Sequence, residues 1–399
     1  MQNKACFLFL QNRIFLIKML FSQIIGQAST KKRLVNSVHE NRISHAQLFL
    51  GEEGTGNLPL ALAYAQFISC TDRQENDSCG KCSSCKKFQK LIHPDLHFVF
   101  PVATSKKITK DAVSDSYISE WRALLIESPY IKLTQWYDYI GLENKQGIIN
   151  TEEGDNIIRK LNLKSFESDY KVMIIWMPEK MNISTANKLL KLVEEPPPMT
   201  VFLFVAETIE EIMPTILSRT QLIKIPRIDG ESIEQHLREN IGKYQINLSD
   251  ITNYVRMASG NFIKLQETIK TNEENQANFD LLTTWLRLCY SRKVVELTSW
   301  VESIAELGRE KQKSFLNYAL RMIRENFILN LARENRERLV YLIHQEATFS
   351  DKFSQFITAN NVFTINEEIN KAHFHIERNG QAKIIFTDLS LTMIKLLKT

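Results

Sequence analysis

The chain has 399 residues, of which 44% are hydrophobic and 24% charged, and its formal net charge is +4. The length predicts two or three domains, and the composition, with no repeat or low-complexity tract, is that of a soluble globular protein. The small positive charge permits an acidic partner such as DNA without arguing for one.

The first 18 residues are apolar but interrupted. Lys4, Arg13 and Lys18 break the hydrophobic run and no small-residue cleavage site follows, so the segment is a poor signal peptide or membrane span. MLFSQIIGQ, which begins at Met19, is a more ordinary start. We therefore expect residues 1–18 to be an N-terminal extension and Met19 to be the true start.

A strand, a glycine loop and a helix are predicted next. Residues 45–51 form a short buried strand, and residues 58–70 have the length and apolar density of a helix with Pro59 in its first turn. The loop between them, GEEGTGNL, has the glycine spacing of a phosphate-binding loop, G-x-x-x-x-G-K-[ST]. Strand, loop and helix in this order are the context that such a loop requires.

This loop lacks the side chains that bind nucleotide. Asn57 and Leu58 stand where the motif has lysine and Ser or Thr, so no ammonium reaches the terminal phosphates and no hydroxyl binds Mg²⁺. The backbone around Gly51, Gly54 and Gly56 could still hold an anion. Taken alone, the segment is equally consistent with a chance run of glycines and with a degenerate nucleotide site.

The strongest local signal is a set of four cysteines, Cys70, Cys79, Cys82 and Cys85. Two C-x-x-C steps share Cys82, and the fourth thiolate comes from the end of the preceding predicted helix. Four thiolates can close a tetrahedral shell around Zn²⁺ and leave no open position, so we predict a structural zinc site. An iron–sulfur cluster and a set of surface thiols are the alternatives. We expect a reducing, cytoplasmic location, which favours metal over disulfides.

Helices alternate with buried strands in the middle of the chain. After a polar segment from about residue 104 to 165, strands are predicted at 170–177 and 200–208, a helix at 184–195, and a helical turn with a further strand within 213–226. Near-continuous apolar strands that alternate with helices indicate a parallel sheet covered on both faces.

Helical patterns dominate the rest of the chain. Amphipathic helices are predicted at 232–244 and 248–270, the second with a break at Gly260, and another helix at 311–332. The polar stretch 271–278 between them is a candidate linker.

The second predicted strand of the chain, 170–177, lacks the acidic pair that an ATPase with a phosphate-binding loop needs. One acid would bind Mg²⁺ and the other would activate water. Trp176 and Met177 stand at these positions. Because two separate parts of one catalytic apparatus are missing together, we interpret the glycine loop as a nucleotide site that has kept its scaffold and lost its chemistry.

Arg219, next to Ser218 after a short predicted helix, has two interpretations. An arginine at the surface is usually held in a salt bridge. Its position after the third strand also fits an arginine that reaches the nucleotide of a neighbouring subunit and raises the rate there by several orders of magnitude.

Several stretches between about residue 20 and residue 228 form a specific combination. They are IIGQ (24–27), HAQLFLGEEGTGN (45–57), the four-cysteine insert, HPD (93–95), ANKLLKLVEEPP (186–197) and PTILSRT (214–220). Together they resemble the bacterial clamp-loader family of DNA polymerase III, and its delta-prime members in particular. The pairing of ANKLLKLVEEPP with ILSR is highly specific for this family.

The resemblance implies a fold and a domain organisation. The fold class is an α/β AAA+ domain with a P-loop-type parallel sheet, a small helical lid and an all-α C-terminal collar that joins subunits into a pentameric spiral. The corresponding boundaries are 19–227 for the AAA+ domain with its zinc insert, 228–272 for the lid and 273–399 for the collar.

The resemblance also implies a function. In this family gamma or tau subunits hydrolyse ATP, delta opens the sliding clamp, and delta-prime is a rigid stator. This chain is therefore expected to be a non-hydrolysing stator that helps to load the clamp onto primed DNA, and not an enzyme on its own. Its expected partners are gamma/tau, delta, the clamp and primed DNA at a nucleoid-associated replisome, and its expected cofactor is structural Zn²⁺, whereas ATP and Mg²⁺ would not be turned over.

Individual positions follow from the same resemblance. Arg219 corresponds to the arginine of the family's SRC motif, with Thr220 in place of the cysteine, and would complete the ATP site of the adjacent motor subunit. The lid's sensing arginine would fall near Ile263, beside Lys264, and the first-sensor position, usually Thr or Asn, falls at Glu207. Both departures reinforce the expected absence of hydrolysis by this chain.

Two other functions fit parts of the sequence. One is a catalytic gamma- or tau-like ATPase of a divergent clamp loader, against which the missing Lys, Ser/Thr, Asp and Glu argue. The other is a zinc-dependent nucleic-acid-binding module, for which only Lys81, Lys86 and Lys87 lie near the cysteines.

Overall fold

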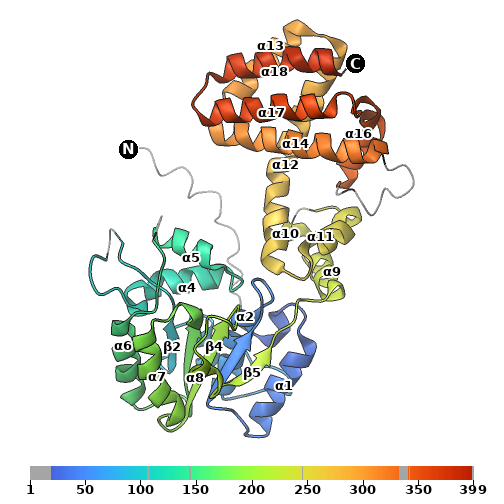
Figure 1. Cartoon of the computed structure of the whole chain (residues 1–399). Coiled ribbons are helices and arrows are strands. Elements are labelled where there is room, and N and C mark those ends of the chain that lie inside the picture. The colour runs from blue at the N-terminus through green and yellow to red at the C-terminus, as the bar shows by residue number, and fades with distance from the viewer. Residues whose placement is uncertain are drawn as a thin grey trace. The chain divides into compact units, whose positions relative to one another are not determined.

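The computed structural model describes residues 19–397 apart from 106–107, 143–144, 245, 332–339 and 341 (Figure 1). The N-terminal extension expected at 1–18 lies outside the described residues. The chain divides into two compact units, Met1–Glu239 with Ala258–Leu265, and Asn240–Met257 with Gln266–Thr399.

The first unit is built on a five-stranded parallel sheet with the strand order β2-β3-β4-β1-β5. Its strands are β1 (Ala46–Leu50), β2 (Leu96–Val99), β3 (Lys171–Trp176), β4 (Thr200–Ala206) and β5 (Gln221–Lys224). All except the edge strand β5 are largely buried, as their apolar runs predict. The predicted strands are confirmed, whereas β2, with the residues LHFV, was not predicted.

Helices cover both faces of this sheet, and successive strand residues face different cores. The first core holds Phe49 with α1 (Ala28–His39) and α2 (Asn57–Ser69). The second holds Leu48 with α6 (Thr151–Asn162), α7 (Ile183–Glu194) and α8 (Pro214–Leu217). The parallel sheet with helices on both faces confirms the predicted α/β class (Figure 1).

The segment predicted only as polar, about 104–165, is in fact largely helical. It contains a 3-10 turn at Ser114–Tyr117, α4 (Ile118–Glu127), α5 (Leu133–Tyr139) and α6. Trp121 and Trp136 from α4 and α5 are fully buried, and the Trp121 ring stacks on Phe100 with centroids 4.2 Å apart. These helices were not predicted, because this part of the core is formed by only a few large apolar residues. They are spaced at helical intervals among polar residues.

From residue 230 onward the described chain is helical. The elements up to residue 291 are α9 (Gly230–Glu239), α10 (Ile241–Tyr244), a 3-10 turn at Leu248–Asp250, α11 (Ile251–Ala258) and α12 (Phe262–Ser291). The predicted break at Gly260 separates α11 from α12 and is confirmed.

The linker predicted at 271–278 is wrong, because α12 runs through it without interruption. The stretch TNEENQAN is polar but contains neither Gly nor Pro, and such residues continue a helix at little cost. The predicted boundary between lid and collar, 272/273, therefore falls inside one helix and stays a prediction.

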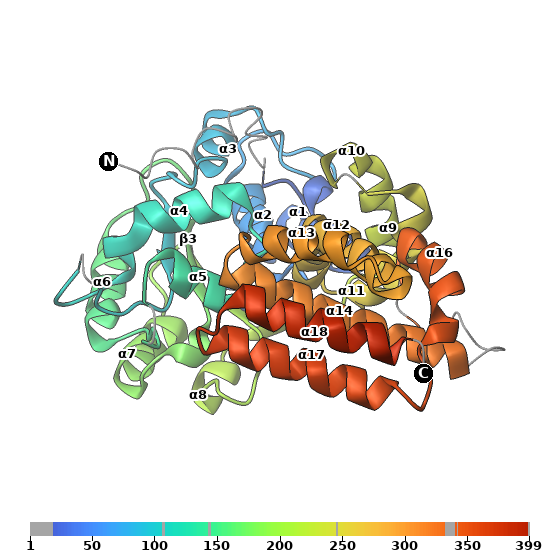
Figure 2. The ribbon, with the colours of Figure 1, turned by 90° about the horizontal axis from the view of Figure 1, so that it is seen from above.

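The second unit has its own helical core. Besides α12 it contains α13 (Val294–Ala305), α14 (Arg309–Leu331), α16 (His344–Phe353), a 3-10 turn at Ser354–Phe356, α17 (Val362–Glu377) and α18 (Ala382–Leu396) (Figure 2). Trp285 and Trp300 stack at its centre with ring centroids 5.6 Å apart. The all-α C-terminal region that was predicted is confirmed. Among the described helices, none is both long and apolar enough to span a membrane.

Candidate functional site

The glycine loop has the backbone geometry of a phosphate-binding loop. It follows β1 directly and leads into α2, which begins at Asn57. Gly54 and Gly56 have positive φ angles of 74° and 94°, a conformation that favours glycine and turns the chain sharply into the helix. The predicted strand, loop and helix are therefore all present, and the question is what the loop can hold.

The Asn57 side chain is used inside the protein. Its amide nitrogen donates to the Gly51 carbonyl at 2.9 Å and to the Ala206 carbonyl at the end of β4 at 3.2 Å, while its oxygen accepts from the Leu58 amide at 2.8 Å. Only 8% of Asn57 is exposed. A side chain that ties the loop to two strands in this way offers no group to a triphosphate.

The chain itself covers the loop. The Phe262 amide donates to the Gly54 carbonyl at 3.0 Å, and a Cβ atom placed on Gly54 would lie only 1.9 Å from Asn261 Oδ1. At Gly56 an added Cβ would meet the Tyr130 ring at 3.4 Å. The Tyr130 and Phe262 rings pack together with centroids 4.7 Å apart. The turn at Asn261 and Phe262 therefore lies against Gly54, and the Tyr130 ring lies against Gly56.

Sequence reasoning missed Tyr130 and Phe262. Tyr130 belongs to the segment predicted as polar, and Phe262 opens α12, so no motif connects either of them to the loop. Tyr130 is also held in place by its hydroxyl, which accepts a hydrogen bond from the Ile25 amide at 3.2 Å. Gln27 from the IIGQ stretch adds bonds from its side-chain amide to the Thr55 carbonyl at 3.1 Å and the Pro226 carbonyl at 2.6 Å.

The end of β3 carries core side chains where an ATPase would carry acids. Trp176 and Met177 are each 2% exposed, and the Trp176 ring lies 5.1 Å from that of Trp121. Neither side chain can bind Mg²⁺ or activate water. Both side chains therefore belong to the hydrophobic core, as their residue types suggested.

Carboxyl groups do lie near this edge of the sheet, but at other positions. Burial, together with the nearby Glu53 and Glu179 carboxylates, raises the pKa of Glu207 to about 7. Burial also raises the pKa of Glu179, whose Oε1 accepts from the Glu207 amide at 3.1 Å. In the described part of the chain these three acids do not approach closely enough to form a metal-binding group.

The lid position expected to carry a sensing arginine holds Ile263, which is 5% exposed. The neighbouring Lys264 donates its backbone amide to the Asn261 side chain at 2.9 Å. Asn261 thus satisfies an amide at the start of α12 while it contacts Gly54, which links this turn to the glycine loop.

Arg219 lies just after α8 and is held by an ion pair. Its guanidinium lies 2.6 Å from Glu194 Oε1 at the end of α7, and it also donates to the Thr215 carbonyl at 2.9 Å and the Ser218 hydroxyl at 3.1 Å. The Arg219 and Glu194 side chains are 37% and 46% exposed. The local salt bridge considered from the sequence is thus present, and the guanidinium still reaches solvent.

The structure brings the four cysteines together. Their sulfur atoms all lie within 4.8 Å of one another, and the Cys70–Cys79, Cys79–Cys85 and Cys70–Cys85 separations are 3.7, 3.9 and 3.6 Å. Sulfurs about 2.3 Å from a tetrahedral zinc ion would be about 3.8 Å apart. The arrangement therefore fits Zn²⁺. Among the described residues it is the one group of metal-binding side chains this close together.

Backbone amides point at the sulfurs. Cys79 donates to Cys70 at 3.4 Å, Cys82 to Cys79 at 3.3 Å, and Cys85 to Cys82 at 3.3 Å. Burial would raise the pKa of Cys82, but hydrogen bonds from Cys85 and Thr71 outweigh it and lower that pKa to about 6. Burial raises the pKa of Cys70 and Cys85, so these two thiols would ionise only with a cation bound beside them.

The cysteine loop is anchored to the rest of the first unit. Asp77 accepts hydrogen bonds from the Phe21 and Ser22 amides at 3.0 and 2.9 Å, and α3 (Ser83–Phe88) follows the third cysteine. Asp95 of the HPD stretch has a similar role, because its carboxylate accepts the backbone amides of residues 166–168 at 2.6 to 2.8 Å. HPD therefore has a structural explanation that its sequence did not reveal.

A family model described as "DNA polymerase III, delta subunit" matches residues 26–229. The matched span contains the glycine loop, the four cysteines and Arg219, and makes up just over half of the chain. The chain belongs to this family.

Similar proteins carry names of several DNA polymerase III subunits. The delta' subunit of Bacillus subtilis strain 168 is 23% identical over 359 residues, which cover 89% of this chain and 93% of that protein. The tau subunit of the same organism is 22% identical over 399 residues, covering 95% of this chain and 62% of that protein. Because delta' and tau relatives both match, family membership does not by itself separate their roles.

Solved structures are also similar. The Bacillus subtilis DNA clamp loader delta protein is 11% identical, with 92% of this chain and 100% of that chain covered and a TM-score of 0.37. At this TM-score the likeness adds nothing to the assignment made from the DNA polymerase III delta-subunit family model.

Proposed function

We propose that this chain is a non-hydrolysing, delta-prime-type subunit of the DNA polymerase III clamp loader. The observation that carries the proposal is the occupied glycine loop. Asn57 bonds to the Gly51 and Ala206 carbonyls, the Phe262 amide bonds to the Gly54 carbonyl, and the Tyr130 ring lies against Gly56 and packs on Phe262. A site filled by its own chain supports a scaffold role better than an ATPase role.

The electrostatics of this region support the same conclusion. An ATPase needs a lysine ammonium at the phosphates and carboxylates for Mg²⁺ and water, and each contributes to stabilising the charge that develops in phosphoryl transfer. Here an amide, an indole and a thioether stand at those positions, in Asn57, Trp176 and Met177. We expect no ATP turnover from this chain alone.

We further propose that Arg219 acts on the nucleotide of a neighbouring motor subunit. Its ion pair with Glu194 is partly exposed, and such pairs contribute about 0–1 kcal/mol, so a stronger anionic partner could displace it. A guanidinium directed at transferring phosphates stabilises the transition state in the subunit that receives it.

The four cysteines are proposed to hold a structural zinc ion. Cys70, Cys79, Cys82 and Cys85 would supply all four ligands, so the ion would cross-link the end of α2 to α3 without an open position for water. The proposed partners are gamma or tau and delta subunits, the sliding clamp, and primed DNA within the assembly.

ATP hydrolysis with purified partners tests the proposal. The isolated chain should show no turnover, and adding it to a gamma/tau and delta mixture should stimulate DNA-dependent hydrolysis. Arg219→Ala should remove most of that stimulation, because the trans-acting cation is lost. Arg238→Ala, which removes an exposed arginine that pairs with Glu234 on α9, is the matched control and should have no effect.

A second variant separates a trans role from a local one. Glu194→Gln breaks the ion pair but leaves the Arg219 guanidinium available, so stimulation should persist. If Glu194→Gln and Arg219→Ala lose stimulation equally, the arginine matters through its local salt bridge, and the trans role is wrong.

The alternative is a gamma- or tau-like ATPase, favoured by the match to tau subunits. It predicts robust phosphate release by the isolated chain, with a dependence on Mg²⁺. Under our proposal even Asn57→Lys with Leu58→Thr should remain inactive, because the acids at the end of β3 are still missing. Turnover by the unmodified chain would support the ATPase.

A further inference from the structure

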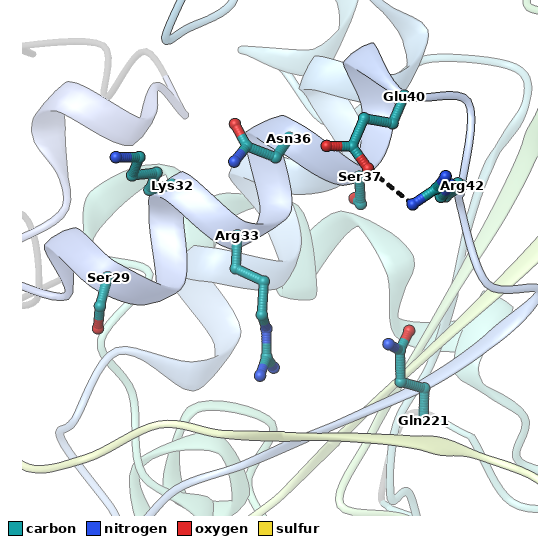
Figure 3. Close-up of a pocket in the computed structure, with 8 residues that line it drawn as sticks. All are labelled: Ser29, Lys32, Arg33, Asn36, Ser37, Glu40, Arg42 and Gln221. Atoms are coloured by element: carbon teal, nitrogen blue, oxygen red, sulfur yellow. Dashed lines mark hydrogen bonds and ion pairs between the residues drawn. The ribbon is translucent and has the colours of Figure 1, made fainter.

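A polar groove lies between α1 and the edge strand β5 of the first unit. It has a volume of about 480 Å³, and its lining includes Ser29, Lys32, Arg33, Asn36, Arg42 and Gln221 (Figure 3). The α1 residues recur at spacings of three and four, so they share one face of the helix. Gln221 is the first residue of β5, and the glycine loop follows the last residue of β1. Because the strands are parallel, the groove lies at their N-terminal ends and the glycine loop at their C-terminal ends.

The lining carries excess positive charge. Its three cations are Lys32, Arg33 and Arg42, and its one carboxylate, Glu40, already pairs with Arg42 at 3.3 Å. Within the residues that the structure describes, Lys32 and Arg33 form no ion pair. Figure 3 shows both side chains extending away from the backbone of α1. Two cations are therefore available to an anionic ligand.

The neutral part of the lining narrows the kind of ligand. It consists of hydroxyl and amide side chains, with no aliphatic or aromatic residue. Protein partners usually bind through buried aromatic or aliphatic anchors, and single-stranded nucleic acids through stacking on aromatic rings. The groove offers neither. Lysine, arginine, serine, asparagine and glutamine are the side chains that contact phosphate oxygens in protein–DNA complexes.

We propose that this groove binds the sugar–phosphate backbone of a nucleic-acid duplex, with Lys32 and Arg33 each contacting a phosphate. The contact reads no bases, so it positions a duplex on the outer face of α1 without selecting a sequence. The proposal rests on the proposed function in that primed DNA is already a partner there, and it assigns a surface to that contact. It does not depend on the absence of ATP hydrolysis, so loss of duplex binding and ATP turnover by the isolated chain are separate outcomes.

Duplex binding by the full-length, zinc-loaded chain tests the proposal. Fluorescein-labelled duplexes of two unrelated sequences are titrated over a range of NaCl concentrations with the parent chain and with Lys32→Gln/Arg33→Gln. Loss of two phosphate contacts should lower the slope of log Kd against log [NaCl] by about 2 and weaken binding about tenfold at moderate salt, equally for both sequences.

The matched control is Arg159→Gln/Lys191→Gln, which removes one arginine and one lysine from the exposed surfaces of α6 and α7. It should leave the affinity and the slope close to those of the parent. An equal loss in the control, an unchanged slope in Lys32→Gln/Arg33→Gln, or a parent chain without salt-dependent binding overturns the proposal. Oligoglutamate serves as an acidic-peptide probe in the same titration. If Lys32→Gln/Arg33→Gln loses oligoglutamate binding but keeps duplex binding, the groove binds acidic peptides and the proposal is wrong.

Discussion

The two ends of α2 carry two different sites, and only one of them keeps its ligand-binding groups. At the N-terminal end the glycine loop retains its backbone turn, but Asn57 replaces the lysine and bonds inward. At the C-terminal end Cys70 joins three other thiols within 4.8 Å. The helix is common to both, so the difference comes from side chains rather than from the fold.

This contrast shows how a site can lose its ligand and remain folded. The buried Gly51 carbonyl needs a hydrogen-bond donor, and the Asn57 amide supplies it. The same amide adds a second donor to the Ala206 carbonyl, which also accepts from the Gly51 amide at 3.1 Å. No protein group satisfies the four thiols to the same extent, because their sulfurs form only weak hydrogen bonds with one another and with nearby amides. The first end should therefore be stable without a ligand, and the second should depend on one.

The largest effect is expected at the cysteine end. Cys85→Ser preserves volume but removes a thiolate ligand, and it should abolish stoichiometric zinc and cost at least about 3 kcal/mol of unfolding free energy. Zinc content by elemental analysis and thermal unfolding measure both. Cys289→Ser, at a buried thiol in the other unit, is the control and should keep the zinc. Full zinc content in Cys85→Ser would contradict the assignment of this ligand.

A smaller loss is expected at the glycine loop. Asn57→Ala leaves the Gly51 carbonyl without its donor and removes one of the two donors of the Ala206 carbonyl, so it should lower the unfolding free energy by about 1–3 kcal/mol. Thermal unfolding in the presence and absence of Mg-ATP checks this, and neither the parent nor the variant should be stabilised by nucleotide. Asn360→Ala, at an exposed asparagine before α17, should change little. Strong stabilisation of the parent by Mg-ATP would show that the loop still binds it.

Glu207, which follows β4, should make the unfolding free energy depend on pH. Its folded-state pKa of about 7 lies above the usual value of 4.5 for a glutamate, so its contribution to stability is complete below pH about 4.5 and is lost as the pH rises through about 7. Glu207→Gln cannot ionise, so it should become more stable than the parent by about 1–3 kcal/mol at alkaline pH. Thermal unfolding across this range tests the sign.

Glu152→Gln, at an exposed carboxylate in the first turn of α6, is the control for that experiment. Its difference from the parent should not grow with pH in this way. A Glu207→Gln difference that stays constant, or that falls as the pH rises, would contradict the burial of Glu207 among the Glu53 and Glu179 carboxylates.

The smallest effect on stability is expected at Arg219. Its ion pair with Glu194 is partly exposed, so Arg219→Ala should change the unfolding free energy by less than about 1 kcal/mol. Arg238→Ala should be similar, since its partner Glu234 is also exposed in part. A large loss for Arg219→Ala alone would indicate a structural role and would weaken the case for a trans-acting arginine.

The sequence predicts those parts of the molecule whose signal is local. Strands β1, β3 and β4 are continuous apolar runs, and the cysteine cluster follows from C-x-x-C spacing, so both could be read directly. The cover over the glycine loop could not, because Tyr130 and Phe262 come from segments far apart in the chain and belong to no motif. The linker expected at 271–278 is wrong because polarity alone does not end a helix.

The hydrogen bonds of Asn57 make a change of this residue to lysine, as one step toward a phosphate-binding loop, unfavourable for stability. A change to lysine would leave the buried Gly51 carbonyl without its donor and remove one donor of the Ala206 carbonyl before any nucleotide affinity was gained. Each intermediate along that path would fold less well than the present chain and would catalyse nothing. Under the proposed function, the absence of a phosphate-binding lysine at this position is thus protected by a stability barrier.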